Sequence, residues 1–379
     1  MIYLNCAATS HRRPACVADA VMRAFAQSGS YGRGAGDEDL DAGRIVFRTR
    51  EKLAWLLGFS HPERVCFSSG ATQALNTAIM GMPRRYGRAI ATDWDHNSTL
   101  RPLARLADEQ GVRVEYVPAG SDGSLDYGAL AALLEEPCDF VTCTHASNVT
   151  GMVCDASRVV AMAHAHGVPV ILDAAQTAGS LPLSMEGLGV DVLCVTGHKA
   201  LMGPTGTGAI LVAPGVELAP LVEGGSGMAS AERRQPAAWP EHLEAGTLNI
   251  QGIAGLEAAV DWLAEQGIES IASHEEALIE RFRAGIEGVS GLKEYGCFDL
   301  PHSGIVSVNL GDVDSAVLAD ELAERYGIAT RAGLHCAPRM HAALGTLEQG
   351  CVRFSFGWFT SENDIDAAVA ALAEIAGGL

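Results

Sequence analysis

The stretch DVLCVTGHKALMGPTGTGAI, from Asp191 to Ile210, places a lysine just after an apolar run. The run ending at Thr196 predicts a buried strand, and the Gly/Pro/Thr segment after Lys199 cannot continue as a helix. A lysine held in a partly apolar pocket beside another cation has a lowered pKa and becomes an amine nucleophile. A solvated loop lysine is the alternative, and it is the commoner case for a lysine taken alone.

Two other polar groups also follow apolar runs. In VILDAAQ, Asp173 ends a strand too apolar to lie at a sheet edge, so its carboxylate should be desolvated and needs a donor or cation. In SSGATQALN, Gly70 permits a tight turn, and the backbone amides of Ala71 and Thr72 then begin a helix whose positive end favours an anion. Taken alone, the turn at Gly70 is more typical of a helix cap, and Asp173 is equally typical of one.

One ligand would use all three features together. Pyridoxal 5'-phosphate (PLP) needs a lysine for its imine, a carboxylate facing its ring nitrogen and amides for its phosphate. Lys199, Asp173 and the Ala71/Thr72 turn match these needs. His96, in DWDHNS, would then stack on the ring, although a single histidine after a strand is more often a helix cap or a core hydrogen-bonding group.

The elements that must position these residues alternate along the chain from about residue 65. Short apolar or β-branched runs are followed by helical patterns, which predicts a mostly parallel central sheet with helices on both faces. Ligands of such sheets bind beyond the carboxyl ends of the strands, where the polar residues noted above would gather. The expected strands lie within 64–69, 88–96, 139–147 and 167–175, and the expected helices within 71–82, 98–111 and 156–167.

After about residue 255 the pattern changes to long amphipathic helices within 252–289, short strands at GIVSVNL and CVRFSFG, and a closing helix at 362–377. This pattern predicts a smaller α+β domain at the C-terminal end. We therefore expect a large domain of residues 21–255 and a small domain of residues 1–20 and 256–379. The stretches 32–43 and 222–236, rich in glycine and charge, are the expected mobile loops.

Composition excludes several classes of function. The formal net charge of −20 and the pI near 4.9 disfavour binding to nucleic acid or to anionic membranes. The glycines after Lys199 do not form a P-loop, and no GxGxxG motif follows an early strand, which disfavours nucleoside triphosphatases and nicotinamide enzymes. The N-terminus has no secretory pattern, and the ten cysteines have no metal-binding or redox spacing, so we expect a cytoplasmic protein with no metal and mostly buried thiols.

Taken in order, the motifs DHNS, SNVTG, DAAQ, TGHKALMGPTGTG, EAGTLN, RAGLHCAP and VRFSFG are recognisable. In order and approximate spacing they resemble the class V aminotransferase family, and most of all its cysteine desulfurases. The resemblance runs from YLNCAAT to the last helix. It implies the PLP-dependent transferase fold type I and a homodimer with shared active sites.

The resemblance also implies a role for each matched residue. Lys199 would bind the cofactor and carry the proton at the substrate Cα, and His96 would lie over the ring. Asp173 would contact the ring nitrogen and Gln176 the phenolic oxygen. Thr72, Thr196 and His198 match phosphate contacts, and Thr247 matches a contact to the neighbouring subunit's cofactor. Asn148 and Arg353 match residues that position the substrate, the arginine by a bidentate grip on its carboxylate.

Cys336, in RAGLHCAP, matches the nucleophile that takes sulfur from L-cysteine as a persulfide and leaves L-alanine. A nucleophilic thiol must be partly ionised, so we expect an exposed site assisted by Arg331 or His335, whereas the other nine cysteines should be buried. The segment resembles the second of two desulfurase groups, which has a compact RxGHHC motif. Leu334 replaces the first histidine of that motif, which affects the sulfur acceptor and the substrate preference.

Rival functions remain within and outside this fold. A selenocysteine lyase acting on L-selenocysteine, another β-lyase or an aminotransferase would use the same cofactor site. A non-catalytic binding scaffold fits poorly, because it has no reason to keep the lysine, aspartate, arginine and cysteine together. A desulfurase also requires an acceptor protein for the sulfur, for example in iron–sulfur cluster assembly.

Overall fold

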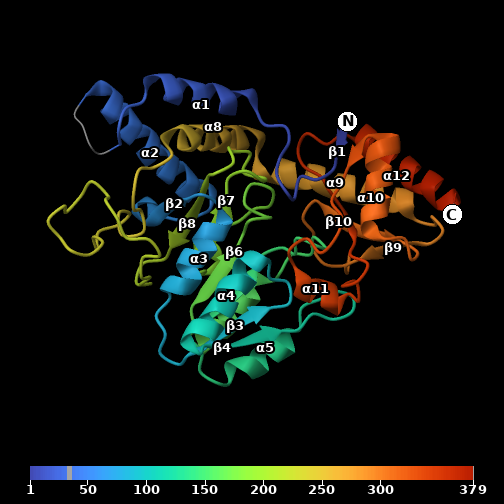
Figure 1. Cartoon of the computed structure of the whole chain (residues 1–379), viewed down its shortest axis with the longest axis horizontal. Coiled ribbons are helices and arrows are strands. Elements are labelled where there is room, and N and C mark those ends of the chain that lie inside the picture. Colours follow the sequence, from blue (N-terminus) through green and yellow to red (C-terminus); the bar gives the residue numbers. More distant parts are fainter. Residues whose placement is uncertain (32–35, 379) are drawn as a thin grey trace.

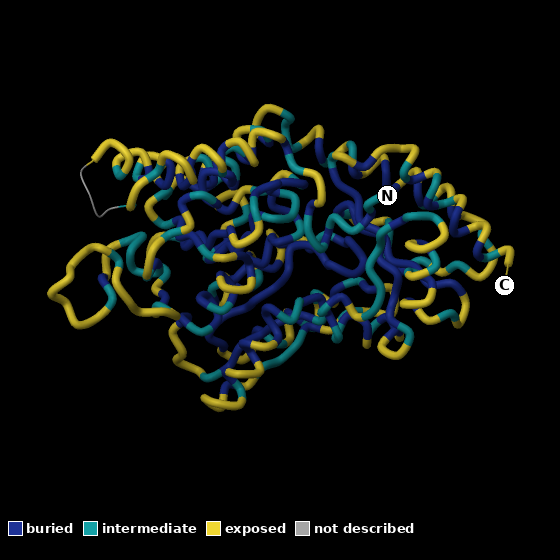
Figure 2. Tube along the Cα trace, turned by 45° about the horizontal axis from the view of Figure 1, so that its top comes forward, coloured by how far each residue is buried: buried dark blue, intermediate teal, exposed yellow. Residues whose placement is uncertain are grey.

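The protein, described by a computed structural model over residues 1–31 and 36–378, has two regions built on separate sheets (Figure 1). A seven-stranded sheet occupies one region, and a three-stranded sheet lies in the other, together with both chain termini. Buried segments run continuously through both regions beneath exposed helix faces (Figure 2). No helix of the described ranges has the length and apolar character needed to cross a membrane.

The large sheet is mostly parallel, as predicted. Strands β3, β4, β5, β6 and β7 pair in parallel, and β8 runs antiparallel between β7 and β2. In spatial order the strands are β2 (Val65–Ser68), β8 (Gly208–Val212), β7 (Val192–Thr196), β6 (Val170–Asp173), β5 (Phe140–Thr144), β3 (Arg88–Thr92) and β4 (Arg113–Val117). Every residue of β7 is buried, as expected for a central strand covered on both faces.

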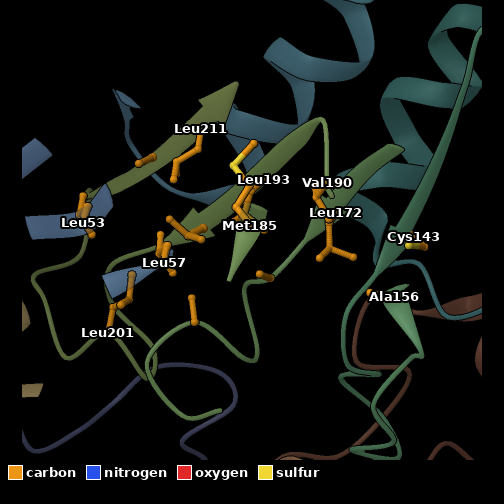
Figure 3. Packing of buried hydrophobic residues seen from close by; sticks show 14 of the residues in the cluster. Leu53, Leu57, Cys143, Ala156, Leu172, Met185, Val190, Leu193, Leu201 and Leu211 are labelled. Carbon is orange, nitrogen blue, oxygen red and sulfur yellow. The ribbon is translucent and has the colours of Figure 1, made fainter. Parts of the chain in front are cut away.

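Successive side chains of a buried strand point to opposite faces of the sheet, so both faces are apolar. Helices cover both of them. Val192 and Cys194 of β7 pack in one apolar cluster with α3 (Ala71–Gly81) and α4 (Asn97–Gln110). Leu193 and Val195 pack in the other cluster, part of which Figure 3 shows. The helices that contribute to this second cluster include α1 (Ala15–Gln27), α2 (Asp37–Leu56), α5 (Tyr127–Leu134), α6 (Ala156–Ala165), α7 (Met185–Leu188) and α8 (Ile250–Gln266).

The smaller region has its own apolar cluster around an antiparallel sheet of order β12–β10–β9. The predicted strands in GIVSVNL and CVRFSFG are β10 (Ile305–Leu310) and β12 (Val352–Ser355), and the predicted closing helix is α12 (Glu362–Gly377). The other elements from the C-terminal part of the chain are β9 (Leu292–Tyr295), α9 (Ile268–Ile286), α10 (Ser315–Tyr326) and α11 (Pro338–Ala343). Strands β1 (Ile2–Tyr3) and β11 (Ile328–Ala329) form a parallel pair, and the short helix η1 (Pro62–Arg64) directly precedes β2.

The division of the chain at residue 255 stays a proposal. Helix α8 crosses that position without interruption and packs against α1 and α2. At the other end of the chain, β1 joins the smaller region, since Ile2 pairs with Ile328. The N-terminal segment therefore connects the two regions physically.

One of the two loop predictions, for residues 32–43, is partly wrong. Residues 37–43 form the first turns of α2, whereas residues 32–35 lie outside the described residues. Asp37, Glu38 and Asp39 favour a helix start because they complement its positive end. The buried side of α2, which includes Ala42 and Val46, recurs at helical spacing. The second stretch, 222–236, contains no helix or strand.

Candidate active site

One pocket lies at the carboxyl ends of the parallel strands, where the sequence placed the chemistry. Strands β5, β6 and β7, the starts of α3 and α4, and strand β12 of the smaller region all contribute to its wall. Among the predicted residues, the pocket is lined by Ala71, Thr72, His96, Asn148, Asp173, Gln176, Thr196, His198, Lys199 and Arg353.

Lys199 is half-buried in this pocket, three residues after the end of β7. Its carbonyl oxygen accepts hydrogen bonds from the Ser10 hydroxyl (2.9 Å) and from the Met202 amide (2.9 Å), which fix the loop. Burial lowers the pKa of the Lys199 amine to about 8, and the cations of Arg353 and Arg331 act in the same direction. Lys199 thus has the properties of an amine nucleophile rather than of a solvated loop lysine.

Asp173 ends β6 and is 4% exposed. Its Oδ1 accepts a hydrogen bond from the Ala175 amide (2.9 Å). Burial raises the pKa of the carboxyl, whereas the Ala175 amide and the Lys199 cation oppose this shift. A buried carboxylate with so little compensation suits a cationic ring nitrogen, and the protonated nitrogen would stabilise its charge.

The start of α3 provides a place for an anion. Gly70, the N-cap, has a φ of 146°, and no side chain of the described residues caps the first amides of the helix. Close packing against this turn requires glycine at position 208 of β8, because a Cβ added to Gly208 would come within 2.6 Å of the Gly70 Cα. Thr72 lies in the first turn, and its hydroxyl is 2.8 Å from that of Ser98. Free amides and hydroxyls at a helix start match a phosphate group.

His96 is the N-cap of α4 and also lines the pocket. Its Nδ1 accepts a hydrogen bond from the Ser98 amide (3.0 Å), so the neutral ring carries its proton on Nε2. Burial lowers the pKa of His96 to about 4, and the nearby cations, Lys199 first among them, add to the effect. The helix-cap interpretation and the pocket interpretation therefore both describe this residue.

Arg353, on β12, is fully buried, and its guanidinium has unused hydrogen-bonding capacity. Nη1 donates to the Asn148 carbonyl (2.8 Å) and Nη2 to Asn5 Oδ1 (3.4 Å), whereas Nε has no partner in the described structure. The backbone amide of Arg353 donates to the Arg331 carbonyl (2.8 Å), which brings two arginines to one pocket. Burial and the Arg331 cation lower the pKa of Arg353 to about 9. Such a group needs an anionic ligand.

Cys336 is half-buried on the turn between β11 and α11, beside the pocket. Its Sγ lies 3.6 Å from Arg331 Nη2, so the thiol has the cationic neighbour expected of a nucleophile. The other expected helper, His335, is buried and hydrogen-bonds elsewhere. The expectation for the remaining cysteines is wrong for Cys16, which is exposed, and for two half-buried thiols, Cys6 and Cys297.

Thr247 lies outside this pocket. Its side chain is exposed and lines an adjacent hollow with Gly206, Thr207 and Asn249. Ser69 and Gln73 line both hollows, so the two are neighbours. The predicted contact of Thr247 to a second subunit stays a prediction.

Several wall residues were missed by the sequence reasoning. Thr144 ends β5, so the rule that placed Asp173 also applies to it. Ala7 and Ala8 come from the N-terminal segment, and the Ala7 carbonyl accepts a hydrogen bond from Gln176 Nε2 (3.3 Å). Nothing in a local pattern predicts that such a segment reaches the pocket. Arg331 was expected only as a neighbour of Cys336.

Comparison with known proteins gives a consistent result. Residues 2–368 match the family Aminotransferase class-V. A probable cysteine desulfurase of Methanothermobacter thermautotrophicus is 33% identical over 99% of this chain and 95% of its own length. A cysteine desulfurase of Yersinia pestis is 30% identical over 99% of this chain and 93% of its own length.

Solved structures agree with these relatives. The apo cysteine desulfurase of Thermococcus onnurineus superposes with a TM-score of 0.92 and 28% identity, over 100% of this chain and 95% of that one. The cysteine desulfurase CsdA of Escherichia coli, in its S-sulfonic acid form, gives 0.89 and 28%, over 100% and 94%. With its fold, its pocket and its full-length match in agreement, this chain belongs to the class V aminotransferase family.

Proposed function

We propose that the protein is a PLP-dependent cysteine desulfurase, which converts L-cysteine to L-alanine and retains the sulfur as a persulfide on Cys336. The observation that carries this proposal is a convergence in one pocket of an amine with a lowered pKa, a buried carboxylate and two arginines, with a thiol beside one arginine. Class V aminotransferases depend on PLP, and the named relatives are cysteine desulfurases.

The residues present fit this cofactor. Lys199 would hold its aldehyde, Asp173 would face its ring nitrogen, and His96 would cover the ring. Bound PLP supplies an electron sink for negative charge that develops at the substrate Cα. The phosphate would contact the amides of Ala71 and Thr72 and the side chains of Thr72, Thr196 and His198. The phenolic oxygen would contact Gln176.

Substrate binding follows from the unpaired groups around Arg353. Its Nε and the Oδ1 of Asn148 are buried without partners in the described structure, which leaves one donor and one acceptor for an amino acid. The guanidinium would bind the substrate carboxylate and so fix which Cα bond faces the cofactor. Lys199, once released, lies on the same wall and would move the Cα proton.

The sulfur step balances with groups of this chain. The Cys336 thiolate attacks the substrate sulfur, the carbon–sulfur bond breaks, and a sulfur–sulfur bond forms. The proton lost by the two thiols is taken up at the substrate Cβ, and alanine leaves. Arg331, 3.6 Å from Sγ, places a positive charge beside the attacking sulfur.

A single assay tests this proposal. The purified protein is supplied with PLP and L-cysteine, then alkylated and examined by peptide mass spectrometry. We expect one alanine per sulfur transferred, and a Cys336 peptide heavier by one sulfur atom. Pyruvate with free sulfide would instead identify a β-lyase, a keto acid with cofactor amination would identify an aminotransferase, and failure to bind PLP would leave only a scaffold.

A parallel assay with L-selenocysteine separates the nearest rival. Leu334 precedes the thiol by two residues and is 38% exposed, so an apolar group lies where the resemblance predicts a histidine. A selenocysteine lyase would release alanine and selenium from selenocysteine much faster than alanine from cysteine. The desulfurase proposal requires the opposite preference or comparable rates.

The finer expectations belong to the same proposal. We infer a homodimer in which Thr247 contacts the partner's cofactor, supported by exposed apolar side chains on α1 and α2 such as Phe25 and Trp55. Cytoplasmic location, a sulfur-acceptor protein and a role in iron–sulfur cluster assembly complete the proposal. Sedimentation of the purified protein tests the dimer, persulfide discharge to candidate proteins tests the acceptor, and cell fractionation tests the location.

A further inference from the structure

The turn that carries Cys336 has an unusual backbone. Both His335 and Cys336 have positive φ values, 50° and 59°, in the left-handed region that residues with a Cβ avoid. Two such residues in succession persist only where surrounding contacts hold them. The carbonyl of His335 accepts a hydrogen bond from Asn148 Nδ2 (2.7 Å), and that of Cys336 accepts one from the Asn97 amide (2.7 Å).

A buried chain of hydrogen bonds holds the same turn from the other side. His335 Nε2 lies 3.0 Å from the Arg331 carbonyl, and His335 Nδ1 lies 3.2 Å from His341 Nε2. His341 Nδ1 lies 2.8 Å from the Thr346 hydroxyl. The two imidazole rings are stacked, with centroids 5.4 Å apart, and both residues are buried.

This chain determines the protonation of both rings. A carbonyl only accepts, so His335 must donate from Nε2, and its Nδ1 must accept when the ring is neutral. His341 then donates from Nε2, and its Nδ1 accepts from Thr346. Burial lowers the pKa of His335 well below its usual value, with the Arg353 cation adding to the effect, and burial lowers that of His341 to about 4. Both rings are therefore neutral near pH 7.

We propose that His341 is a positioning residue for sulfur transfer: through His335 it fixes the Cys336 turn, and with it the place of the thiol beside Arg331. This inference rests on the proposed function, because it assigns a role within the Cys336 step. His341 comes from α11, which follows the turn, and neither substrate nor cofactor needs to contact it.

The proposal separates two parts of the site. Lys199 follows strand β7, Asp173 ends β6 and Arg353 lies on β12, so none of them depends on His341 for its place. Without the His341 donor, the buried Nδ1 of His335 has no hydrogen-bond partner, and a buried unpaired acceptor destabilises the folded conformation of the turn. We expect the ring to move and the turn to relax, so that the thiol leaves its position while cofactor and substrate still bind.

The test compares three variants. His341→Leu removes the donor, His341→Gln keeps an N–H donor at the end of a similar reach, and Thr346→Val removes only the outer link. In single-turnover reactions with cysteine, we expect His341→Leu to slow persulfide formation on Cys336 by about tenfold or more, with KM changed by less than about twofold. His341→Gln should recover most of the rate, and Thr346→Val should show a smaller loss.

A matched control and a second readout complete the design. His274→Leu removes a half-buried histidine whose ring nitrogen lies 3.0 Å from the Thr360 carbonyl on the α9 side of the molecule, and it should leave persulfide formation unchanged. Alkylation of Cys336 by iodoacetamide, followed by mass spectrometry in protein without cofactor, reports the thiol directly. In His341→Leu the rate of alkylation at a fixed pH should fall, because the thiol no longer lies beside Arg331.

Each outcome is decisive. A folded His341→Leu variant with wild-type persulfide formation and alkylation would overturn the proposal. So would a His341→Gln variant as slow as His341→Leu, because the donor would then not matter. If His341→Leu does not fold, Thr346→Val and His341→Gln are compared with the wild-type protein instead. Wild-type rates of persulfide formation and of Cys336 alkylation in Thr346→Val would then count against the proposal. Absence of any persulfide in the wild-type protein would overturn the proposed function instead. The alkylation of Cys336 would still show whether His341 fixes the position of the thiol.

Discussion

Lys199 lines the pocket and Cys336 lies beside it, but the two residues are held in place by different kinds of structure. Lys199 follows β7, a fully buried strand that pairs with β6 on one side and β8 on the other. Cys336 occupies a left-handed turn between a two-residue strand and a six-residue helix, held by the side chains of Asn148 and His335 and by a backbone hydrogen bond from Asn97. Strand pairing places the amine, whereas the thiol depends on a few isolated hydrogen bonds.

The difference has a chemical consequence. Cofactor chemistry is common to the class V aminotransferase fold, and the groups that would perform it end strands of the large sheet. The fate of the sulfur is specific, and the group that would receive it lies on the turn between β11 and α11. Variants at the two places should therefore fail in different ways.

The largest effect is expected for Lys199→Ala. Without the amine, the protein cannot hold the cofactor aldehyde or move the Cα proton, so we expect cysteine turnover to fall by about 10³-fold or more. The chain has two other lysines, Lys52 and Lys293. Borohydride treatment of the PLP-loaded protein should therefore fix the cofactor on the Lys199 peptide alone, and Lys293→Ala should behave as wild type. Normal cysteine consumption by Lys199→Ala would refute the assignment.

Cys336→Ala should separate the two halves of the site. We expect unchanged cofactor absorbance and a spectral response to added cysteine, because the lysine side is intact. Alanine production should fall by roughly 10²-fold or more, with no persulfide on the protein, since the sulfur has lost its acceptor. The exposed Cys16 offers the control variant Cys16→Ala. Unaltered sulfide release would make Cys336 a bystander and the protein another kind of lyase.

Arg353→Ala should affect binding more than chemistry. The substrate carboxylate loses a buried charged partner, so KM for cysteine should rise roughly 30-fold or more, with a smaller change in kcat. Arg353→Lys keeps the charge but not the planar fork, and we expect it to recover only part of the loss. Arg281→Ala, which breaks an exposed ion pair with Asp366, is the control. An unchanged KM would place carboxylate binding on Arg331 or elsewhere.

Much of the fold was predictable because helix and strand periodicities alternate clearly after residue 65. The helix expected over 71–82 is α3, Ala71–Gly81. Two features were beyond local pattern. The antiparallel direction of β8 depends on which strands it pairs with, and α2 is stabilised where its apolar side meets α8. Its glycine and acidic residues have the composition of a loop.

The same limit separates the two sides of the site. Lys199 and Asp173 could be predicted because each follows an apolar run, and the carboxyl ends of parallel strands meet at one edge. Cys336 was found only by resemblance, and His341 has no local signal at all. Its role depends on His335 and Thr346, which it meets through the turn and the loop after α11.

The smallest effect concerns the pH at which the protein without cofactor captures PLP. Capture requires the neutral amine, and burial lowers the pKa of Lys199 to about 8, so the neutral fraction rises as pH increases through that value. We expect the capture rate to increase about fivefold between pH 7 and 8 and to level off by about pH 9, as followed by stopped-flow absorbance. An ordinary lysine would continue to gain about tenfold in capture rate per pH unit up to pH 10.

The Asp173 carboxylate opposes the lowering of the Lys199 pKa, so Asp173→Asn should move the midpoint of capture to lower pH. His341→Leu should leave this midpoint unchanged while it lowers the alkylation rate of Cys336. A shift of the capture midpoint in the same variant would show that the amine and the thiol are not positioned independently.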